Sequence, residues 1–302
     1  MTGAEESLAG RAETIRLHGL SVGERLGIYD DFAGRVWSLG ESGLNPAFTP
    51  SRSDYFQLFC TPSFPGLRDA SRRRQHLWFD AYIERVLSKD AAELYRLQFP
   101  DRLNNLLNKL AAQGTAELVA AHIGRALDIP QRSVPTYLAA LSDVFLLNQL
   151  PSWGTNLEKR AISKPKVFLS DTALATSLAG LDPEALEMNI SSTITGGICE
   201  AFVANELLKQ KAWSSIDYRL FHFRTSTGKE VDLVLESRSR DIVGVEVKAA
   251  MSIQPKDFAG LRYLQQVAGA SFRAGIVLYT GKDVLPMGKN LWAMPISTLW
   301  HG

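Results

Sequence analysis

The stretch Gly228–Lys248 has the sequence GKEVDLVLESRSRDIVGVEVK, and two valine-rich segments within it decide the fold. Val231–Leu235 and Val243–Val247 have the length and composition of β-strands. The flanking chain adds an amphipathic helix at Ile198–Lys209, a strand at Tyr218–Phe223, a hairpin turn at Thr225–Gly228, a helix at Asp257–Val267 and an apolar strand at Ala274–Tyr279. The resulting order, α-β-β-β-α-β, predicts an α/β domain with hairpins and one crossover.

The same strands carry a group of charged residues that could perform chemistry. Glu246 and Lys248 stand two residues apart, so on a strand they share one face. Asp232 is flanked by apolar neighbours on the other strand, and we expect the three side chains to converge. Carboxylate oxygens of Asp232 and Glu246 suit Mg²⁺ or Mn²⁺, and Lys248 would position the attacking water. Glu200, on the preceding helix, would assist as a further ligand or water holder, with Glu206 a secondary candidate.

A non-catalytic interpretation of these residues stays open. An aspartate and a Glu-x-Lys pattern also occur on strands whose charged face is simply solvated. In that case the domain would be a platform for binding.

A helical region precedes this domain. Apolar residues recur at helical spacing in three groups: Trp78, Tyr82, Val86 and Leu87; Leu103, Leu106, Leu107 and Leu110; and Leu118, Val119, His122, Ile123 and Leu127. Asp128-Ile129-Pro130 ends the third helix, a further helix starts near Ser133, and strands follow at Phe145–Leu147 and Lys166–Leu169. This order predicts a winged helix-turn-helix, in which Gln131, Arg132, Ser133 and Thr136 would contact DNA. The alternative is a helical adaptor that never touches DNA.

The first 70 residues carry few apolar residues for a core of their own. Ile15 and Leu17 suggest a short strand, Val22–Asp31 a helix, and the proline-rich stretch 40–66 a loop. Arg72-Arg73-Arg74 cannot share one helix face, which favours a solvated helix start over a phosphate site.

Composition excludes several classes of protein. The chain has 302 residues, 45% of them hydrophobic and 22% charged, with a formal net charge of +1, so any basic footprint must be local. No apolar run is long enough to cross a bilayer, and the acidic start does not resemble a signal peptide. Cys60 and Cys199 are far apart, which argues against a disulfide scaffold or a zinc site. We expect a soluble cytoplasmic protein.

Taken together, these segments resemble a known family. Asp232 with Glu246-Val247-Lys248 resembles the PD-(D/E)xK nuclease-like superfamily, and almost the whole chain resembles the carboxyl-terminal portion of AAA-type ATPases that end in a DUF4143 domain. The supporting stretches are Ser7–Arg11, Leu20–Glu24, Lys164–Asp171 and Gly228–Asp232. The resemblance implies an ATPase domain, a winged helix and a nuclease-like (restriction-endonuclease-like) domain.

The chain departs from that family at its front. The sequence contains no G-x-x-x-x-G-K-[ST] phosphate-binding loop, so we expect no ATP hydrolysis by this chain alone. The expected division is a remnant of the ATPase domain or lid over 1–70, with Arg11 left from a sensing region, a winged-helix region over 71–175 and the nuclease-like domain over 176–302. An intact ATPase is the third and least supported alternative.

The leading hypothesis is a DNA-binding protein with a nuclease-like domain that hydrolyses phosphodiester bonds with Mg²⁺ or Mn²⁺. The alternative is a non-catalytic regulatory module from a truncated AAA-type ATPase. DNA is the expected partner, no membrane is expected, and homo-oligomerisation stays open.

Overall fold

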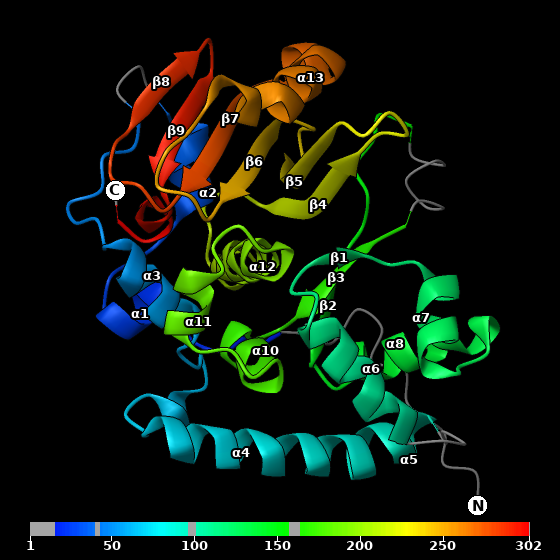
Figure 1. The fold of residues 1–302 in the computed structure, drawn as a ribbon. Helices are drawn as coiled ribbons and strands as arrows, with labels where there is room; N and C mark the ends of the chain where they lie inside the picture. The colour runs from blue at the N-terminus through cyan, green and yellow to red at the C-terminus, as the bar shows by residue number, and fades with distance from the viewer. Residues whose placement is uncertain (1–15, 40–42, 96–100, 157–163, 302) are drawn as a thin grey trace, which may run out of the picture.

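Two β-sheets organise the protein, which we describe from a computed structural model over residues 16–39, 43–95, 101–156 and 164–301. Figure 1 shows the smaller sheet among helices in the lower half and the larger sheet in the upper half. Helix α12 lies on one side of the larger sheet and helix α13 on the other. The structure is therefore a mixed α/β fold in which helices come first and the large sheet comes last.

The amino-terminal helices are short, and the three α-helices among them begin at side-chain caps. They are α1 (Val22–Leu26), α2 (Phe32–Trp37), α3 (Arg52–Phe59) and the 3-10 turn η1 (Pro65–Leu67). Ser21 and Glu24 form a reciprocal capping box at the start of α1, and Gly27, with φ of 68°, ends that helix. The helix predicted over Val22–Asp31 therefore ends early, at Leu26, and α2 begins only beyond the predicted range, while α3 interrupts the predicted loop at 40–66. Leu17, half of the strand predicted at Ile15 and Leu17, is 88% exposed and lies outside any strand. Ile15 and the stretch Ser7–Arg11 lie outside the described residues.

A longer helix starts at the three consecutive arginines. Ser71 caps α4 (Arg72–Arg85), so Arg72-Arg73-Arg74 form its exposed first turn, as the solvated interpretation predicted. The π-helical turn η2 (Val86–Ala91) and α5 (Ala92–Tyr95) continue it.

The smaller sheet closes a compact set of helices. The elements are α6 (Asp101–Ala111), β1 (Ala116–Glu117), α7 (Ala120–Leu127), η3 (Gln131–Ser133), α8 (Val134–Asp143), β2 (Leu147–Leu150) and β3 (Lys166–Leu169). β3 lies between β1 and β2 and is antiparallel to both. Asp128, with φ of 51°, turns the chain between α7 and α8. The helices predicted before and after Asp128-Ile129-Pro130 are present, and so is the strand predicted over Lys166–Leu169. The strand predicted over Phe145–Leu147 begins only at Leu147, because Phe145, with φ of 60°, lies in the turn after α8, and β1 was not predicted.

The part of the chain that builds the larger sheet follows the predicted α-β-β-β-α-β order, from α12 to β7. After α10 (Thr172–Leu178) and α11 (Pro183–Met188) come α12 (Thr193–Gln210), β4 (Tyr218–Arg224), β5 (Glu230–Ser237), β6 (Ile242–Lys248), η4 (Pro255–Phe258), α13 (Ala259–Ala268), η5 (Gly269–Ser271), β7 (Phe272–Tyr279), β8 (Leu285–Gly288), β9 (Leu291–Pro295) and η6 (Ile296–Leu299). The strand order is β4-β5-β6-β7-β9-β8, in which β6, β7 and β9 are parallel to one another. The hairpin β8–β9 was not predicted.

One hydrophobic core runs through most of the fold. It extends from Val22 in α1 to Trp300 near the carboxyl end and includes both faces of α12. A second, smaller core lies between the sheet and α13. Within the described ranges, no helix is long and apolar enough to cross a membrane.

Candidate active site at the ends of β5 and β6

The predicted acidic residues meet where β5 and β6 stop pairing with each other. The ladder between these strands ends at Leu233 opposite Val245. Beyond that point, Asp232 reaches across to β6, and its Oδ2 accepts a hydrogen bond of 2.9 Å from the backbone N–H of Val247. Asp232 is thereby held beside the segment that carries Glu246.

A β-bulge in β5 explains the orientation of Asp232. Phe221 of β4 pairs with Val234, and Phe223 pairs with Val231. The two pairs are two residues apart along β4 but three residues apart along β5, so β5 carries one extra residue. Val231 and Val234 consequently both pack into the core beneath α13, although a regular strand would point them to opposite faces. The intervening Asp232 is left to face the side of the sheet that α12 covers.

A lysine that the sequence did not single out lies among these acids. Lys166 is the first residue of β3, and its side chain, only 5% exposed, crosses from the smaller sheet to the larger one. Its Nζ lies 2.8 Å from Oε1 of Glu200 and 2.7 Å from Oε1 of Glu230. A third ion pair, of 3.4 Å, joins it to Oδ1 of Asp232. Burial alone would lower the pKa of Lys166, but the carboxylates outweigh it, so the pKa lies above its ordinary value and the ammonium stays charged.

Glu246 and Lys248 form the other half of the site. Lys248 Nζ lies 2.7 Å from Oε1 of Glu246, and Val245 and Val247 pack into the core, as the alternation along the strand predicted. The second oxygen of Glu246, Oε2, is buried, and among the described residues no hydrogen-bond donor reaches it. A buried carboxylate oxygen without a partner is costly, and it marks a position where a cation or an ordered water would be stabilised.

The electrostatics show an excess of negative charge. Burial raises the pKa of Glu200 to about 8, and the charge of Asp232 adds to the rise against the opposing effect of Lys166. Burial likewise raises the pKa of Glu246 to about 8, and Asp232 again adds to it. Both acids therefore favour a proton, or another cation, near neutral pH.

These residues fit one kind of divalent metal site. In the part of the chain that the structure describes, no three histidine, cysteine, aspartate or glutamate side chains are arranged to hold a metal ion by themselves. Mg²⁺ is commonly held by one or two carboxylates together with water and substrate phosphate. Asp232 and the unpartnered oxygen of Glu246 supply such a pair.

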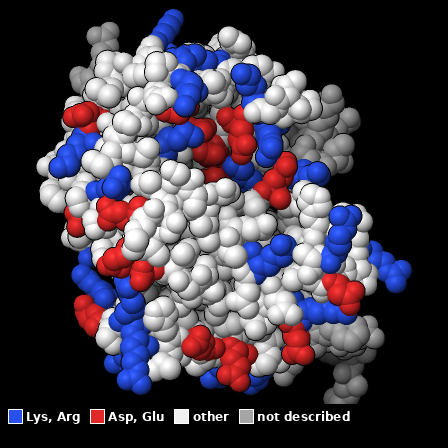
Figure 2. Space-filling view, in the orientation of Figure 1, with Lys and Arg blue, Asp and Glu red and all other residues white. Residues whose placement is uncertain are grey.

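On the face drawn in Figure 2, acidic side chains gather with basic ones in a recess over β5 and β6. The neighbouring surface holds a polar pocket of about 450 Å³ between the two sheets. Its lining includes Lys164 and Arg224, and Arg224 Nη1 lies 3.6 Å from Oε2 of Glu230. Positive groups thus stand next to the acids, where a phosphate backbone would need them.

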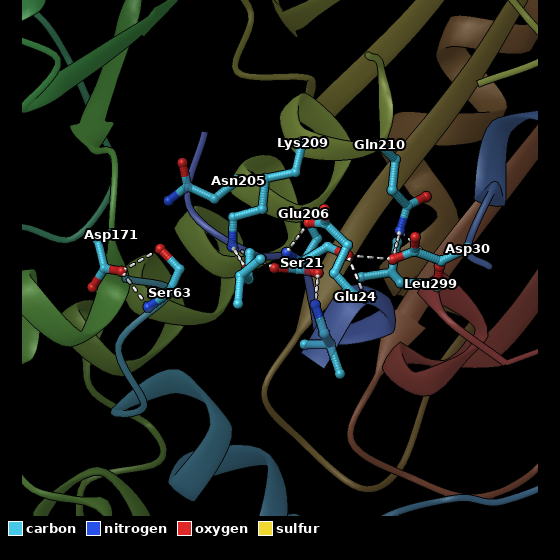
Figure 3. Close-up of polar contacts among 12 residues, drawn as sticks. Ser21, Glu24, Asp30, Ser63, Asp171, Asn205, Glu206, Lys209, Gln210 and Leu299 are labelled. Carbon is cyan, nitrogen blue, oxygen red and sulfur yellow. Dashed lines mark hydrogen bonds and ion pairs between the residues drawn. The ribbon is translucent and has the colours of Figure 1, made fainter. Parts of the chain in front are cut away.

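Glu206, the secondary candidate, belongs to a different network (Figure 3). Its Oε2 accepts a hydrogen bond of 2.8 Å from the backbone N–H of Val22, and its Oε1 lies 2.7 Å from Nζ of Lys209. Lys209 also donates to the carbonyl oxygen of Leu20 at 3.1 Å. Glu206 is 1% exposed and fastens the amino-terminal segment to α12, so the structure gives it a supporting role.

The residues predicted to contact DNA lie in η3 and the first turn of α8, whereas the acids lie at β5 and β6 of the larger sheet (Figure 1). Gln131, Arg132 and Thr136 are exposed and Ser133 is partly exposed, while Val134 and Tyr137 turn inward. The group therefore presents a polar surface to solvent.

Comparisons with known proteins agree with part of the resemblance. Residues 195–299 match the family model described as Domain of unknown function (DUF4143), and residues 52–185 match the one described as Domain of unknown function (DUF8612). The chain is 30% identical over 296 residues to Uncharacterized protein Rv2008c of Mycobacterium tuberculosis, and equally to Uncharacterized protein Mb2031c of Mycobacterium bovis. The match covers 97% of this chain and 58% of each relative. No solved structure matches the chain significantly.

Proposed function

We propose that the site at the ends of β5 and β6 is a Mg²⁺-dependent phosphodiesterase centre of nuclease-like type that acts on DNA. The observation that carries the proposal is the placement of Asp232 beside Glu246, whose buried Oε2 has no donor among the described residues. Mg²⁺ or Mn²⁺ bound there supplies a water of lowered pKa and neutralises charge that develops on the phosphate.

The surrounding side chains have roles that follow from their positions. Lys248 is 32% exposed beside Glu246, so its ammonium can orient the attacking water or contact the phosphate. Glu200 holds its proton to a higher pH than an ordinary glutamate, and it can hold a water from the α12 side. Asp232 and Glu246 bind the cation.

The helical region supports DNA as the substrate. The order α6, β1, α7, α8, β2, β3, with the three strands in one antiparallel sheet, is the order expected of a winged helix and supports that proposal. In that arrangement α8 is the recognition helix. Gln131, Arg132 and Ser133 lie in η3 just before it and Thr136 in its first turn, where base edges are usually met.

A plasmid-nicking assay with Mg²⁺ or Mn²⁺ tests the hydrolytic proposal. We expect Asp232→Asn and Glu246→Gln each to lower the rate by roughly 100-fold or more, because each removes a charge that holds the cation. The matched control is Asp241→Asn, a partly exposed acid just before β6, at the strand's opposite end, paired with Arg273. Cleavage that survives Asp232→Asn would rule out this site as the source of the activity.

One observation favours a second candidate, a non-catalytic binding module from an AAA-type ATPase. Lys166 already pairs with three carboxylates, so the chain supplies a cation of its own where a metal is proposed. Fluorescence anisotropy with duplex DNA separates the candidates: the module predicts binding that needs no divalent ion, weakens on Arg132→Ala and leads to no cleavage by any variant.

A further inference from the structure

Lys166 differs from an ordinary structural ion pair in the number and arrangement of its partners. It leaves β3, in the smaller sheet, and reaches carboxylates on two elements of the other part of the fold, α12 and β5. Lys209 offers a comparison, because it is similarly buried, at 8% exposure, but pairs with one carboxylate, Glu206. Lys166 is therefore the centre of an acid cluster rather than one half of a pair.

The cluster carries more acids than bases. Its carboxylates are Glu200, Glu230, Asp232 and Glu246, and its ammonium groups are Lys166 and Lys248. With all groups ionised, four negative charges face these two ammonium groups and the guanidinium of Arg224 beside Glu230, which leaves a local charge of −1. Such a cluster attracts a further cation, and that cation must share carboxylates with the lysines already present.

The lengths of the three ion pairs of Lys166 indicate which of them a bound metal ion would displace most readily. Lys166 Nζ is 2.7 Å from Glu230 and 2.8 Å from Glu200 but 3.4 Å from Asp232. Asp232 is thus the most weakly held partner, and it is also one of the two proposed metal ligands. Glu230 lies outside the proposed metal pair and can keep the ammonium when Asp232 turns to another cation.

We propose that Lys166 is the resident cation of this acid cluster and competes with a divalent metal ion for Asp232. In the metal-free protein its ammonium offsets part of the negative charge of the cluster. Metal binding transfers Asp232 from Lys166 to the ion, and Lys166 remains with Glu230 and Glu200. This inference rests on the proposed function, since it concerns the same metal pair, but it is tested by binding and stability rather than by cleavage.

The experiment is a calorimetric titration with Mn²⁺ of wild type, Lys166→Gln and Lys248→Gln at one pH. Both substitutions remove one positive charge beside the cluster, but only Lys166 contacts Asp232. Competition predicts that Lys166→Gln binds Mn²⁺ roughly tenfold more tightly than wild type and clearly more tightly than Lys248→Gln. Equal gains in the two variants, or no gain in Lys166→Gln, would overturn the proposal in favour of general electrostatics or a purely structural lysine.

Thermal melting covers the case in which a substitution impairs folding. Without metal, Lys166→Gln and Lys166→Met leave buried carboxylates uncompensated and should lower Tm. Competition predicts that Mn²⁺ raises the Tm of both Lys166 variants by more than it raises the Tm of Lys209→Gln, which loses a comparable buried pair but keeps the metal site of wild type. A rise for neither Lys166 variant, or an equal rise for Lys209→Gln, would contradict it.

Failure of this inference and failure of the proposed function are distinguishable. Metal-dependent cleavage that requires Asp232, together with no gain in Mn²⁺ affinity on Lys166→Gln, removes the competition and keeps the function. Tight Mn²⁺ binding by Lys166→Gln, with no cleavage by any variant, keeps the competition and removes the function.

Discussion

At the residue scale, burial decides what each charged side chain of the site can do. Glu200 and Glu246 are shielded from water by the sheet and by α12, so burial and the charge of Asp232 raise their pKa values to about 8. Glu230 stands nearer to solvent; burial alone would raise its pKa, but Lys166 and Arg224 outweigh that effect and hold it below its ordinary value. Within the cluster, Glu200 and Glu246 thus favour the protonated form, whereas Glu230 favours the ionised form.

The raised pKa of Glu200 predicts a pH dependence of stability. Because the folded state holds this proton to a higher pH than the unfolded chain does, the free energy of unfolding falls as pH rises from about 4.5 to about 8. Glu200→Gln removes the titrating group and should flatten that part of the profile in metal-free buffer. Urea denaturation at several pH values measures it, with Glu187→Gln, a partly exposed acid paired with Arg52, as the control. An unchanged slope for Glu200→Gln would contradict the assignment.

At the scale of elements, close backbone approaches hold the strands of the site in place. Gly260, near the start of α13, packs directly on β5, and a Cβ at this position would lie 1.8 Å from the carbonyl oxygen of Glu230. Gly244 of β6 similarly faces Leu261 and Leu264 of α13. The helix can therefore lie flat on β5 and β6 only because these positions lack side chains.

The contact at Gly260 leads to a prediction about α13. Gly260→Ala should destabilise the protein by about 1–3 kcal/mol, because the methyl group must push α13 away from the backbone at Glu230. Gly196→Ala is the matched control: it lies in the first turn of α12 with open space around it, and the gain in helix propensity should leave stability equal or higher. Chemical denaturation measures both, and a neutral Gly260→Ala would show that α13 adjusts freely.

At the scale of the whole molecule, α12 joins parts of the chain that are far apart in sequence. Phe59 of α3 packs on Phe202 with ring centroids 4.7 Å apart. Gln210 accepts a hydrogen bond from the backbone N–H of Phe32 and donates to the carbonyl oxygen of Leu299 (Figure 3). The amino-terminal helices bury their apolar residues against α12, which explains why they carry too few to form a core of their own.

Removing one buried acid should weaken this joining of distant segments. Glu206→Ala leaves the ammonium of Lys209 and the N–H of Val22 buried without their partner, so we expect a loss of about 3–5 kcal/mol in unfolding free energy. Glu187→Ala, which breaks a partly exposed pair with Arg52, should cost about 1 kcal/mol or less. Circular dichroism and tryptophan fluorescence during urea denaturation report the change, and similar losses for the two variants would count against this role of Glu206.

The local pattern of residues was sufficient to predict the elements with strong periodicity. Valine-rich segments gave β5 and β6, and alternation placed Val245 and Val247 inward, opposite Glu246 and Lys248. The short strand β1 and the hairpin β8–β9 have no such pattern; β1 has two residues and β8 is largely exposed, so pairing with a neighbour creates them.

What the sequence by itself determined is the order α-β-β-β-α-β and the strands on which Asp232, Glu246 and Lys248 stand, because strand periodicity depends on near neighbours. Only the tertiary structure decided that a bulge turns Asp232 toward α12 and that Lys166, 66 residues earlier, lies 3.4 Å from it. The physical reason is that charge pairing in a core depends on distance in space, and chain folding alone brings β3 beside β5.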